Sequence, residues 1–240
     1  MAGCGYVCPV CEGRGYTDEG ADCSWCGAAS IEPIKAALPQ KQQTSYQYYA
    51  IYKPYGYLSQ FVCEHNNKKL LGELYHFPEG VMPVGRLDEP SEGLLLLSNH
   101  GKFHEHLLAH HVEKEYWVLV EGQVHDDTIA QLSEGVGIST QSQVYQTKPA
   151  LVTRLDKVLF EERKPKVRYH PRKQHTWLSI TIKEGKYRQI RKMTAVVGHP
   201  TLRLIRMRIG NLMLHQQVKP STIFTFNESD LINLGMHPQL

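Results

Sequence analysis

The chain has 240 residues, 41% of them hydrophobic, and a formal net charge of +3 at pH 7. This length suffices for one substantial core domain with a small appendage. No hydrophobic segment approaches the roughly 20 residues of a membrane-spanning helix, and the start lacks the basic and apolar regions of a signal peptide, so we expect a cytoplasmic protein. Residues 1–32 hold five acids against one arginine, whereas residues 183–208 hold eight basic residues against one acid. A polyanionic partner would therefore bind the second region.

Four cysteines near the start have the spacing of metal ligands. They form two Cys-x-x-Cys pairs, Cys8 with Cys11 and Cys23 with Cys26, separated by a short loop that contains glycines. Each pair can direct two thiolates at one tetrahedral ion, and a segment this short has no hydrophobic core of its own. The spacing predicts a zinc-ribbon-like module over residues 1–32, with a structural Zn²⁺ that supplies its folding free energy. Two disulfides or free thiols are the alternatives, which a reducing compartment disfavours.

Residues 33–46 mix prolines with Gln, Lys, Ser and Thr, which predicts a linker, and the main domain then spans residues 47–240. Aromatic alternation predicts a strand over residues 46–52, and the Lys-Pro-Tyr-Gly sequence that follows predicts a turn. A short helical pattern comes next, over residues 70–74.

The sharpest local signal lies in residues 85–101, where an Arg86/Asp88 pair precedes four consecutive leucines. The leucine run predicts a strand that is buried on both faces, and the Asn-His-Gly sequence after it predicts a turn. A carboxylate in a loop beside such a strand is rigidly held, which suits a catalytic role for Asp88. Alternatively, Asp88 pairs with Arg86 or caps a turn.

The rest of the main domain alternates between helices and strands. Hydrophobic periodicity predicts a helix around residues 103–108, and its histidines do not favour a metal site because no carboxylate cluster accompanies them. Further elements are predicted as strands at 114–120, 148–155 and 176–183, and as helices at 126–132 and from about residue 188. Residues 154–173 hold eight basic residues against three acids and two prolines, which predicts a loop or arm that contacts RNA.

Three cations stand at the start of the last of these helices: Arg188, Arg191 and Lys192. Cations at a helix N-terminus oppose the helix dipole, so a purely structural purpose explains them poorly. An anionic partner explains them better.

Three separated stretches, residues 85–101, 184–193 and 197–210, resemble in order and spacing the RNA pseudouridine synthases that modify ribosomal RNA. A Lys-x-Tyr sequence at 114–116 is similar to a further motif of these enzymes. The Thr-Leu-Arg-Leu-Ile-Arg run at 201–206 is most similar to the ribosomal large-subunit pseudouridine synthase E group. The resemblance implies an α+β fold, a mixed and largely antiparallel sheet with flanking helices, and the strands and helices predicted above agree with that class.

The resemblance implies that one uridine in ribosomal RNA, expected to be 23S RNA of the large subunit, is isomerised to pseudouridine. Asp88 takes the place of the catalytic carboxylate, Arg191 that of the basic residue that pairs with it, and Tyr116 that of the tyrosine against the target base. Candidate substrate-binding residues are Arg86, Arg188, Lys192 and Leu204, the last as a wall of the base pocket. No cofactor and no catalytic metal are implied, and we expect a monomer whose partner is ribosomal RNA or the assembling large subunit.

Other functions remain as alternatives. A noncatalytic RNA-binding or ribosome-assembly factor could keep the same fold, but the joint presence of Asp88, Tyr116 and Arg191 argues against it. A pseudouridine synthase that acts on a different RNA is a second alternative. A zinc-dependent hydrolase is disfavoured because four cysteines around one ion leave no open position for water.

Overall fold

The computed structural model describes residues 46–64, 67–108, 112–168, 172–233 and 235. These residues belong to one structural unit, Tyr46–Leu240. The predicted zinc module, with its four cysteines, lies outside the described residues, and so does almost all of the predicted linker. In the part of the chain that is described, no three His, Cys, Asp or Glu side chains are grouped so that they could hold a metal ion. Within the same ranges, no helix is long and apolar enough to cross a membrane.

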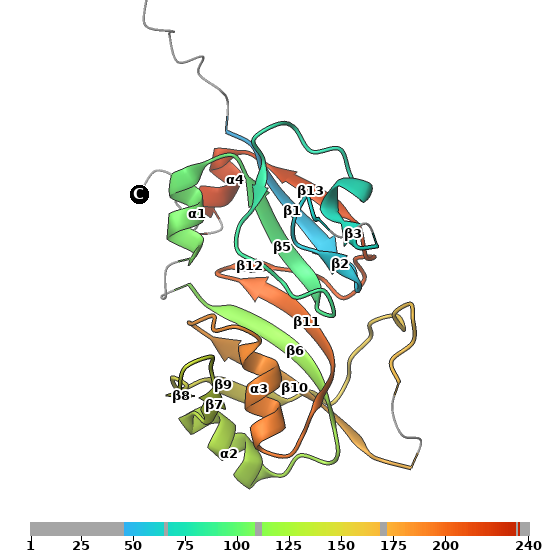
Figure 1. The fold of residues 1–240 in the computed structure, drawn as a ribbon, viewed down its shortest axis with the longest axis vertical. Coiled ribbons are helices and arrows are strands. Elements are labelled where there is room, and N and C mark those ends of the chain that lie inside the picture. The colour runs from blue at the N-terminus through green and yellow to red at the C-terminus, as the bar shows by residue number, and fades with distance from the viewer. Residues whose placement is uncertain (1–45, 65–66, 109–111, 169–171, 234, 236–240) are drawn as a thin grey trace, which may run out of the picture. The chain divides into compact units, whose positions relative to one another are not determined.

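A nine-stranded sheet forms the centre of this unit (Figure 1). Its strands are β1 (Tyr48–Lys53), β4 (Met82–Pro83), β5 (Glu92–Ser98), β6 (Lys114–Glu121), β9 (Leu151–Arg154), β10 (His175–Ile182), β11 (Thr201–Ile209), β12 (Leu212–Met213) and β13 (Ile223–Phe226). The order is β13-β1-β5-β11-β6-β10-β9, with β4 paired to β5 and β12 paired to β11. Neighbours in this sheet are antiparallel except β5 and β11, which run parallel. This confirms the predicted mixed, largely antiparallel sheet.

Helices cover both faces of the sheet. The described residues contain four α-helices: α1 (Gly101–Leu108), α2 (Asp126–Glu134), α3 (Gln189–Val196) and α4 (Glu228–Asn233). Side chains of α1 and α4 enter the core on one face, whereas side chains of α2 and α3 enter the core on the opposite face, which we call the α3 face. Two small two-stranded sheets and a 3₁₀ turn complete the unit: β2 (Tyr57–Leu58) with β3 (Lys69–Leu70), β7 (Gly137–Ser139) with β8 (Val144–Gln146), and η1 (Leu71–Glu73).

The leucine run of β5 is buried on both sides, as predicted. Leu94 and Leu96 belong to the core under α1, Leu95 and Leu97 belong to the core on the α3 face, and each is at most 2% exposed. Two packed faces explain an uninterrupted hydrophobic strand, because both sets of alternating side chains leave water. The loop that precedes β5, which contains Asp88, is therefore attached to one of the most buried strands of the sheet.

Gly93 lies where β5 and β11 approach each other. Its φ is +107°, and an added Cβ would lie 2.3 Å from the Arg206 carbonyl oxygen and 2.6 Å from the Arg206 nitrogen. Gly93→Ala is therefore expected to lower the free energy of unfolding by about 3 kcal/mol or more, because backbone rather than a flexible side chain must move. Urea denaturation measures the loss.

Gly101→Ala is the matched control for this prediction. Gly101 is the first residue of α1, and a Cβ there would meet nothing within 4 Å. Alanine at this position is expected to leave the free energy of unfolding unchanged or to raise it by up to about 1 kcal/mol. Equal stability of the two variants would contradict the close approach at Gly93.

Candidate active site

Asp88 is held on a fixed backbone while its carboxylate stays accessible. Leu87, the residue before it, is buried, and its backbone N–H and C=O both hydrogen-bond the Ser59 hydroxyl, at 3.0 Å and 2.9 Å. The Asp88 carbonyl accepts a hydrogen bond from the Ser91 N–H at 2.9 Å. The Asp88 side chain keeps 27% of its surface exposed. Such a group is positioned by its neighbours and can still reach a ligand.

The cation nearest to Asp88 is Arg188, whose Nη1 lies 3.8 Å from Asp88 Oδ2. Arg188 precedes α3 and has φ 54° and ψ 33°, the left-handed conformation that residues other than glycine rarely adopt. Strain of this kind, on the order of 1–3 kcal/mol, persists where surrounding contacts enforce it, and it is concentrated at functional sites. The Arg86 side chain is exposed. The ion pair of Asp88 is therefore with Arg188, and not with Arg86 as in the alternative considered above.

Two buried polar residues hold the turn before α3. The Gln189 side chain accepts a hydrogen bond from the Lys186 N–H at 2.9 Å and donates one to Glu184 at 2.6 Å. Glu184 also accepts hydrogen bonds from the Tyr145 hydroxyl at 2.7 Å and from the Lys148 N–H at 3.0 Å. The Glu-Gly-x-x-x-Gln sequence thus has a structural explanation: it ties the β7–β8 hairpin to the start of α3 and enforces the backbone conformation there.

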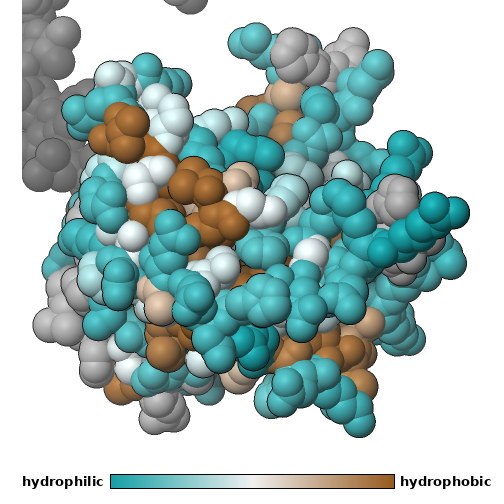
Figure 2. Space-filling model, turned by 90° about the horizontal axis from the view of Figure 1, so that it is seen from below, coloured by the Kyte–Doolittle hydropathy of each residue, from teal (hydrophilic) through white to brown (hydrophobic). Residues whose placement is uncertain are grey.

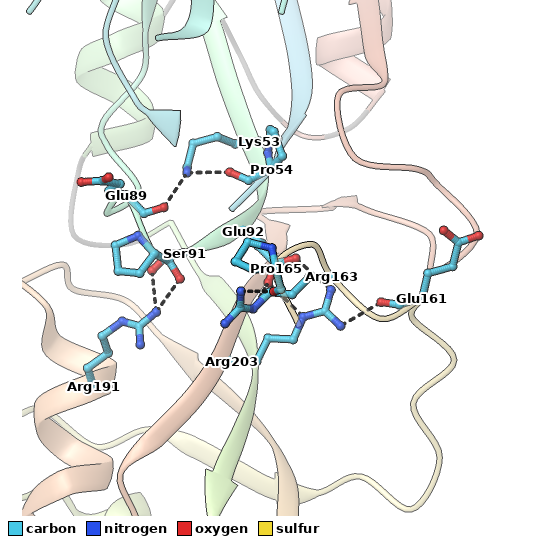
Figure 3. Close-up of polar contacts among 11 residues, drawn as sticks. Lys53, Pro54, Glu89, Ser91, Glu92, Glu161, Arg163, Pro165, Arg191 and Arg203 are labelled. Atoms are coloured by element: carbon cyan, nitrogen blue, oxygen red, sulfur yellow. Dashed lines mark hydrogen bonds and ion pairs between the residues drawn. The ribbon is translucent and has the colours of Figure 1, made fainter. Parts of the chain in front are cut away.

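Arg191 contacts the loop that carries Asp88 at Pro90 and Ser91 rather than at Asp88 itself. Its guanidinium donates to the Pro90 carbonyl at 2.8 Å and to the Ser91 hydroxyl at 3.2 Å (Figure 3). Burial lowers the pKa of Arg191, as does the nearby Arg188 guanidinium, whereas the Asp88 carboxylate acts in the opposite direction. Arg191 therefore acts on Asp88 through the electric field and through the backbone of the loop, and the ion pair within 4 Å belongs to Arg188.

Tyr116 and Leu204 lie on the α3 face, the same face as Leu87. Leu204 of β11 is paired with Val118 of β6, and it is 5% exposed. Tyr116, two residues before Val118, is half-buried and packs against both hydrophobic cores of this face, including the core that contains Leu87. The structure thus places Tyr116 and Leu204 on the sheet face that carries α3, and the ion pair with Arg188, just before α3, holds the Asp88 carboxylate on the same face.

Comparisons with known proteins assign the chain to a family. A family model described as RNA pseudouridylate synthase matches residues 47–196. The chain belongs to this family. The ribosomal large subunit pseudouridine synthase E of Xanthomonas axonopodis pv. citri is 40% identical to this synthase over 165 residues, which are 68% of this chain and 85% of that protein.

Other relatives show the same family membership. The protein of the same name from Vibrio parahaemolyticus is 40% identical over 164 residues, which cover 68% of this chain and 66%, just under two thirds, of that protein. The ribosomal small subunit pseudouridine synthase A of Salmonella typhimurium is 31% identical over 203 residues, 82% of this chain and 78% of that protein. A crystal structure of a pseudouridylate synthase has a TM-score of 0.62 at 24% identity, covers 79% of this chain and 74% of that one, and supports the fold.

Lys192, the remaining candidate for substrate binding, contacts the β7–β8 hairpin and Tyr187 in this synthase. Its ammonium donates to the Ser139 carbonyl at 2.7 Å and lies 5.4 Å from the centre of the Tyr187 ring. Tyr187 is 71% exposed although it directly precedes Arg188. An exposed aromatic ring among cations provides a surface on which nucleobases stack, so Lys192 contributes to the surroundings of the site rather than to its centre.

Lys53 is a residue of the synthase whose role the sequence did not reveal. It ends β1, its side chain is fully buried, and its ammonium donates to the Tyr57 carbonyl at 2.7 Å, to the Pro54 carbonyl at 3.0 Å and to the Glu89 carbonyl at 3.5 Å. Figure 3 shows Lys53 and Arg191 approaching the Glu89–Ser91 turn from different sides. The only signal in the sequence was a lysine at the start of a Pro-Tyr-Gly turn.

A pH dependence of stability follows from this burial, which lowers the pKa of Lys53 to about 7. An unfolded lysine keeps its proton to about pH 10.4, so between these values the unfolded state binds more protons than the folded state. Stability therefore rises with pH in this window, by at most about 1.4 kcal/mol per pH unit from this group, and below pH 7 the full cost of the buried charge is present.

Lys53→Met removes this titration and serves as the test. Urea denaturation at pH 6 and pH 9 should show that the wild-type synthase gains free energy of unfolding relative to the variant as the pH rises. A difference between the two proteins that does not change with pH would contradict the lowered pKa.

Proposed function

We propose that this synthase isomerises a specific uridine of large-subunit ribosomal RNA to pseudouridine, with Asp88 as the catalytic carboxylate. The observation that carries the proposal is the accessible Asp88 carboxylate, 3.8 Å from Arg188, on the sheet face that also holds Tyr116 and Leu204. The choice of RNA is supported by the names of the relatives that are about 40% identical.

The reaction is a rearrangement without net oxidation or reduction. The bond between ribose C1′ and uracil N1 breaks, the uracil turns, C1′ bonds to C5, and the proton of C5 is lost while N1 gains one. Asp88 must be ionised, either to attack C1′ or to remove the proton of C2′. We assign Tyr116 and Leu204 to holding the detached uracil, and the chemistry requires no cofactor.

A uridine inside folded RNA must leave its stack to enter such a site, at a cost of about a few kcal/mol. Basic and aromatic residues around the site supply contacts that offset this cost, among them Lys186, Tyr187 and Lys192. On the face that Figure 2 shows, most visible residues are hydrophilic, and Lys186 and Lys192 supply positive charge for phosphates. Affinity for RNA should consequently fall steeply as salt rises, because each neutralised phosphate releases counterions.

Tritium release from RNA labelled at uridine C5 tests the function. The wild-type synthase is expected to release tritium from large-subunit RNA, as a transcript or as a precursor particle, and not from small-subunit RNA. Release from small-subunit RNA alone would point to a different target. Tight RNA binding without release from any of these RNAs would favour the noncatalytic assembly factor.

We further propose that the residues outside the described unit form a zinc module held by Cys8, Cys11, Cys23 and Cys26, and that the synthase works as a cytoplasmic monomer. The two Cys-x-x-Cys pairs support the zinc, because four thiolates complete a tetrahedral structural site. The acidic charge of residues 1–32 favours contact with protein over contact with RNA.

Removal of zinc separates a structural ion from a catalytic one. A chelator is expected to release about one zinc per chain and to make residues 1–32 sensitive to protease, while tritium release by the main domain continues. Zinc content is measured by atomic absorption. Immediate loss of turnover in folded protein, restored at once by zinc, would contradict a structural role.

A further inference from the structure

The described residues between β9 and β10, 155–168 and 172–174, lie to one side of β10 and β11, and we call residues 155–168 the arm (Figure 1). Its first part is attached to the sheet. Phe160 packs its ring edge against Tyr52 and Trp117, with ring centres 6.2 Å and 5.9 Å apart, and the Leu159 N–H donates to the Gln216 side chain at 2.7 Å. Beyond this anchor the arm exposes basic side chains: Lys164, Lys166 and Arg168.

Arg163 departs from this pattern because its side chain turns inward and is only 10% exposed. Its guanidinium lies 3.8 Å from the centre of the Tyr55 ring, and its Nε lies 3.8 Å from Glu92 Oε1. The same guanidinium donates to the Pro165 carbonyl (Figure 3). A basic arm thus sends one of its cations into the interior of the unit.

Two of the contacts of Arg163, those with Tyr55 and Glu92, lead to the segment that carries Asp88. Tyr55 belongs to the turn after β1, and the next residue, Gly56, donates its N–H to the Glu89 carbonyl at 2.9 Å. Glu92 begins β5, four residues after Asp88. Arg163 is therefore linked to the segment that carries Asp88 at two points: directly at Glu92, and indirectly at Glu89 through the Tyr55–Gly56 turn.

The stability of the buried Glu92 carboxylate does not explain Arg163. Arg203 already binds both oxygens of Glu92, at 2.9 Å and 2.8 Å, and also donates to the Glu161 carbonyl of the arm at 3.0 Å. Arg163 is thus a second cation near Glu92, which already has Arg203 as its partner. The buried Nε of Arg163 has no hydrogen-bond partner in the described part of the chain. Buried polar groups without partners are costly, so a purely structural purpose explains this side chain poorly.

We infer that Arg163 is a positioning residue: it ties the arm to the Asp88–Glu92 segment, so that RNA held by the exposed cations of the arm sets the position of Asp88. The inference rests on the proposed function. The contact can be released at low cost, since Glu92 keeps both hydrogen bonds from Arg203 when Arg163 moves. Small displacements of a reacting group are enough to change the rate of the chemical step strongly.

Steady-state tritium release from labelled large-subunit RNA tests the inference. Arg163→Ala is expected to lower kcat about tenfold or more, because Asp88 loses its alignment, while KM for the RNA stays within about twofold. Arg168→Ala is the matched control, since it removes the same charge from the exposed part of the arm. It should raise KM and reduce the salt dependence, with no comparable fall in kcat.

Three results would overturn the inference. The first is a wild-type kcat in Arg163→Ala, and the second is a rise in KM alone, as in Arg168→Ala. The third is full recovery of kcat in Arg163→Lys, because an ammonium carries the charge but cannot stack flat on Tyr55. A merely structural Arg163 would lower the urea midpoint of the alanine variant and leave the kcat of the folded enzyme unchanged.

Should Arg163→Ala fail to fold, Tyr55→Leu tests the same contact from the other side. The leucine variant is expected to show the same fall in kcat at unchanged KM, and an unchanged kcat would overturn the inference. Absence of tritium release by the wild-type synthase from every RNA would instead defeat the proposed function. The two failures are thus distinguishable.

Discussion

Asp88→Ala is expected to lower the rate of tritium release from large-subunit RNA by at least about 1000-fold, while the affinity for RNA stays within about threefold. In the proposed mechanism the carboxylate acts on the ribose in the transition state, so its removal eliminates the chemical step. Binding depends on the basic surfaces around the site, which the substitution leaves in place. Single-turnover release at saturating RNA measures the rate, and filter binding measures the affinity.

Asp88→Asn should lose as much activity as Asp88→Ala, because the amide keeps the size of the side chain but cannot ionise. Asp127→Asn removes one carboxylate from the exposed start of α2 and provides the control for net charge. A rate for Asp88→Asn within about tenfold of the wild type would exclude Asp88 as the catalytic carboxylate.

Arg203→Met is expected to lower the free energy of unfolding by about 3–5 kcal/mol. Glu92 is 1% exposed and Arg203 6% exposed, so the methionine leaves a buried carboxylate without its two closest donors. Arg163, whose Nε is 3.8 Å away, replaces them only in part. For a unit of this size the loss corresponds to a fall in Tm of about 6–20 °C, which differential scanning calorimetry measures.

Lys166→Met breaks an exposed pair and serves as the control for this loss. The side chains of Lys166 and Glu162 are 79% and 50% exposed, and such pairs contribute at most about 1 kcal/mol. Combining Arg203→Met with Glu92→Gln should recover much of the stability, because the buried carboxylate that lost its two donors is then uncharged. A fall in Tm for Arg203→Met that is no larger than that for Lys166→Met would show that Glu92 finds other partners.

The parts of the fold that the sequence predicted are those with a strong local pattern. The leucines of β5, the alternation of β6 and the switch to helical spacing at Ile190 each follow from side-chain periodicity, and each corresponds to an element of the structure. Residues 201–209 were harder to assign, because arginines stand between their hydrophobic residues. The structure shows why: Arg203 and Arg206 in β11 are buried, the first on Glu92 and the second on the Leu94 carbonyl at 2.7 Å.

The sequence predicted residues for the candidate site, and the structure differs from the prediction in which arginine pairs with Asp88. The motifs identified Asp88, Tyr116 and Leu204, which the structure places on one face of the sheet. They favoured Arg191 as the partner of Asp88, whereas the structure places Arg188 there, since spacing along a helix does not reveal a left-handed residue before its first turn. The role of Arg163 depends on contacts between residues more than seventy positions apart, which no local pattern contains.

The parallel pairing of β5 with β11 sets how far the chain must extend to hold the residues of the proposed site together. Asp88 precedes β5, whereas Tyr116, Arg188 and Arg191 belong to the part of the unit that β11 connects to β5. The family match ends at residue 196, before β11 begins, and β13, which pairs with β1 at the edge of the sheet, comes later still. A fragment that stops at residue 196 would contain all four residues and lose the strand that holds them face to face. A fragment that keeps the two parts joined must therefore extend at least through β11, to Ile209.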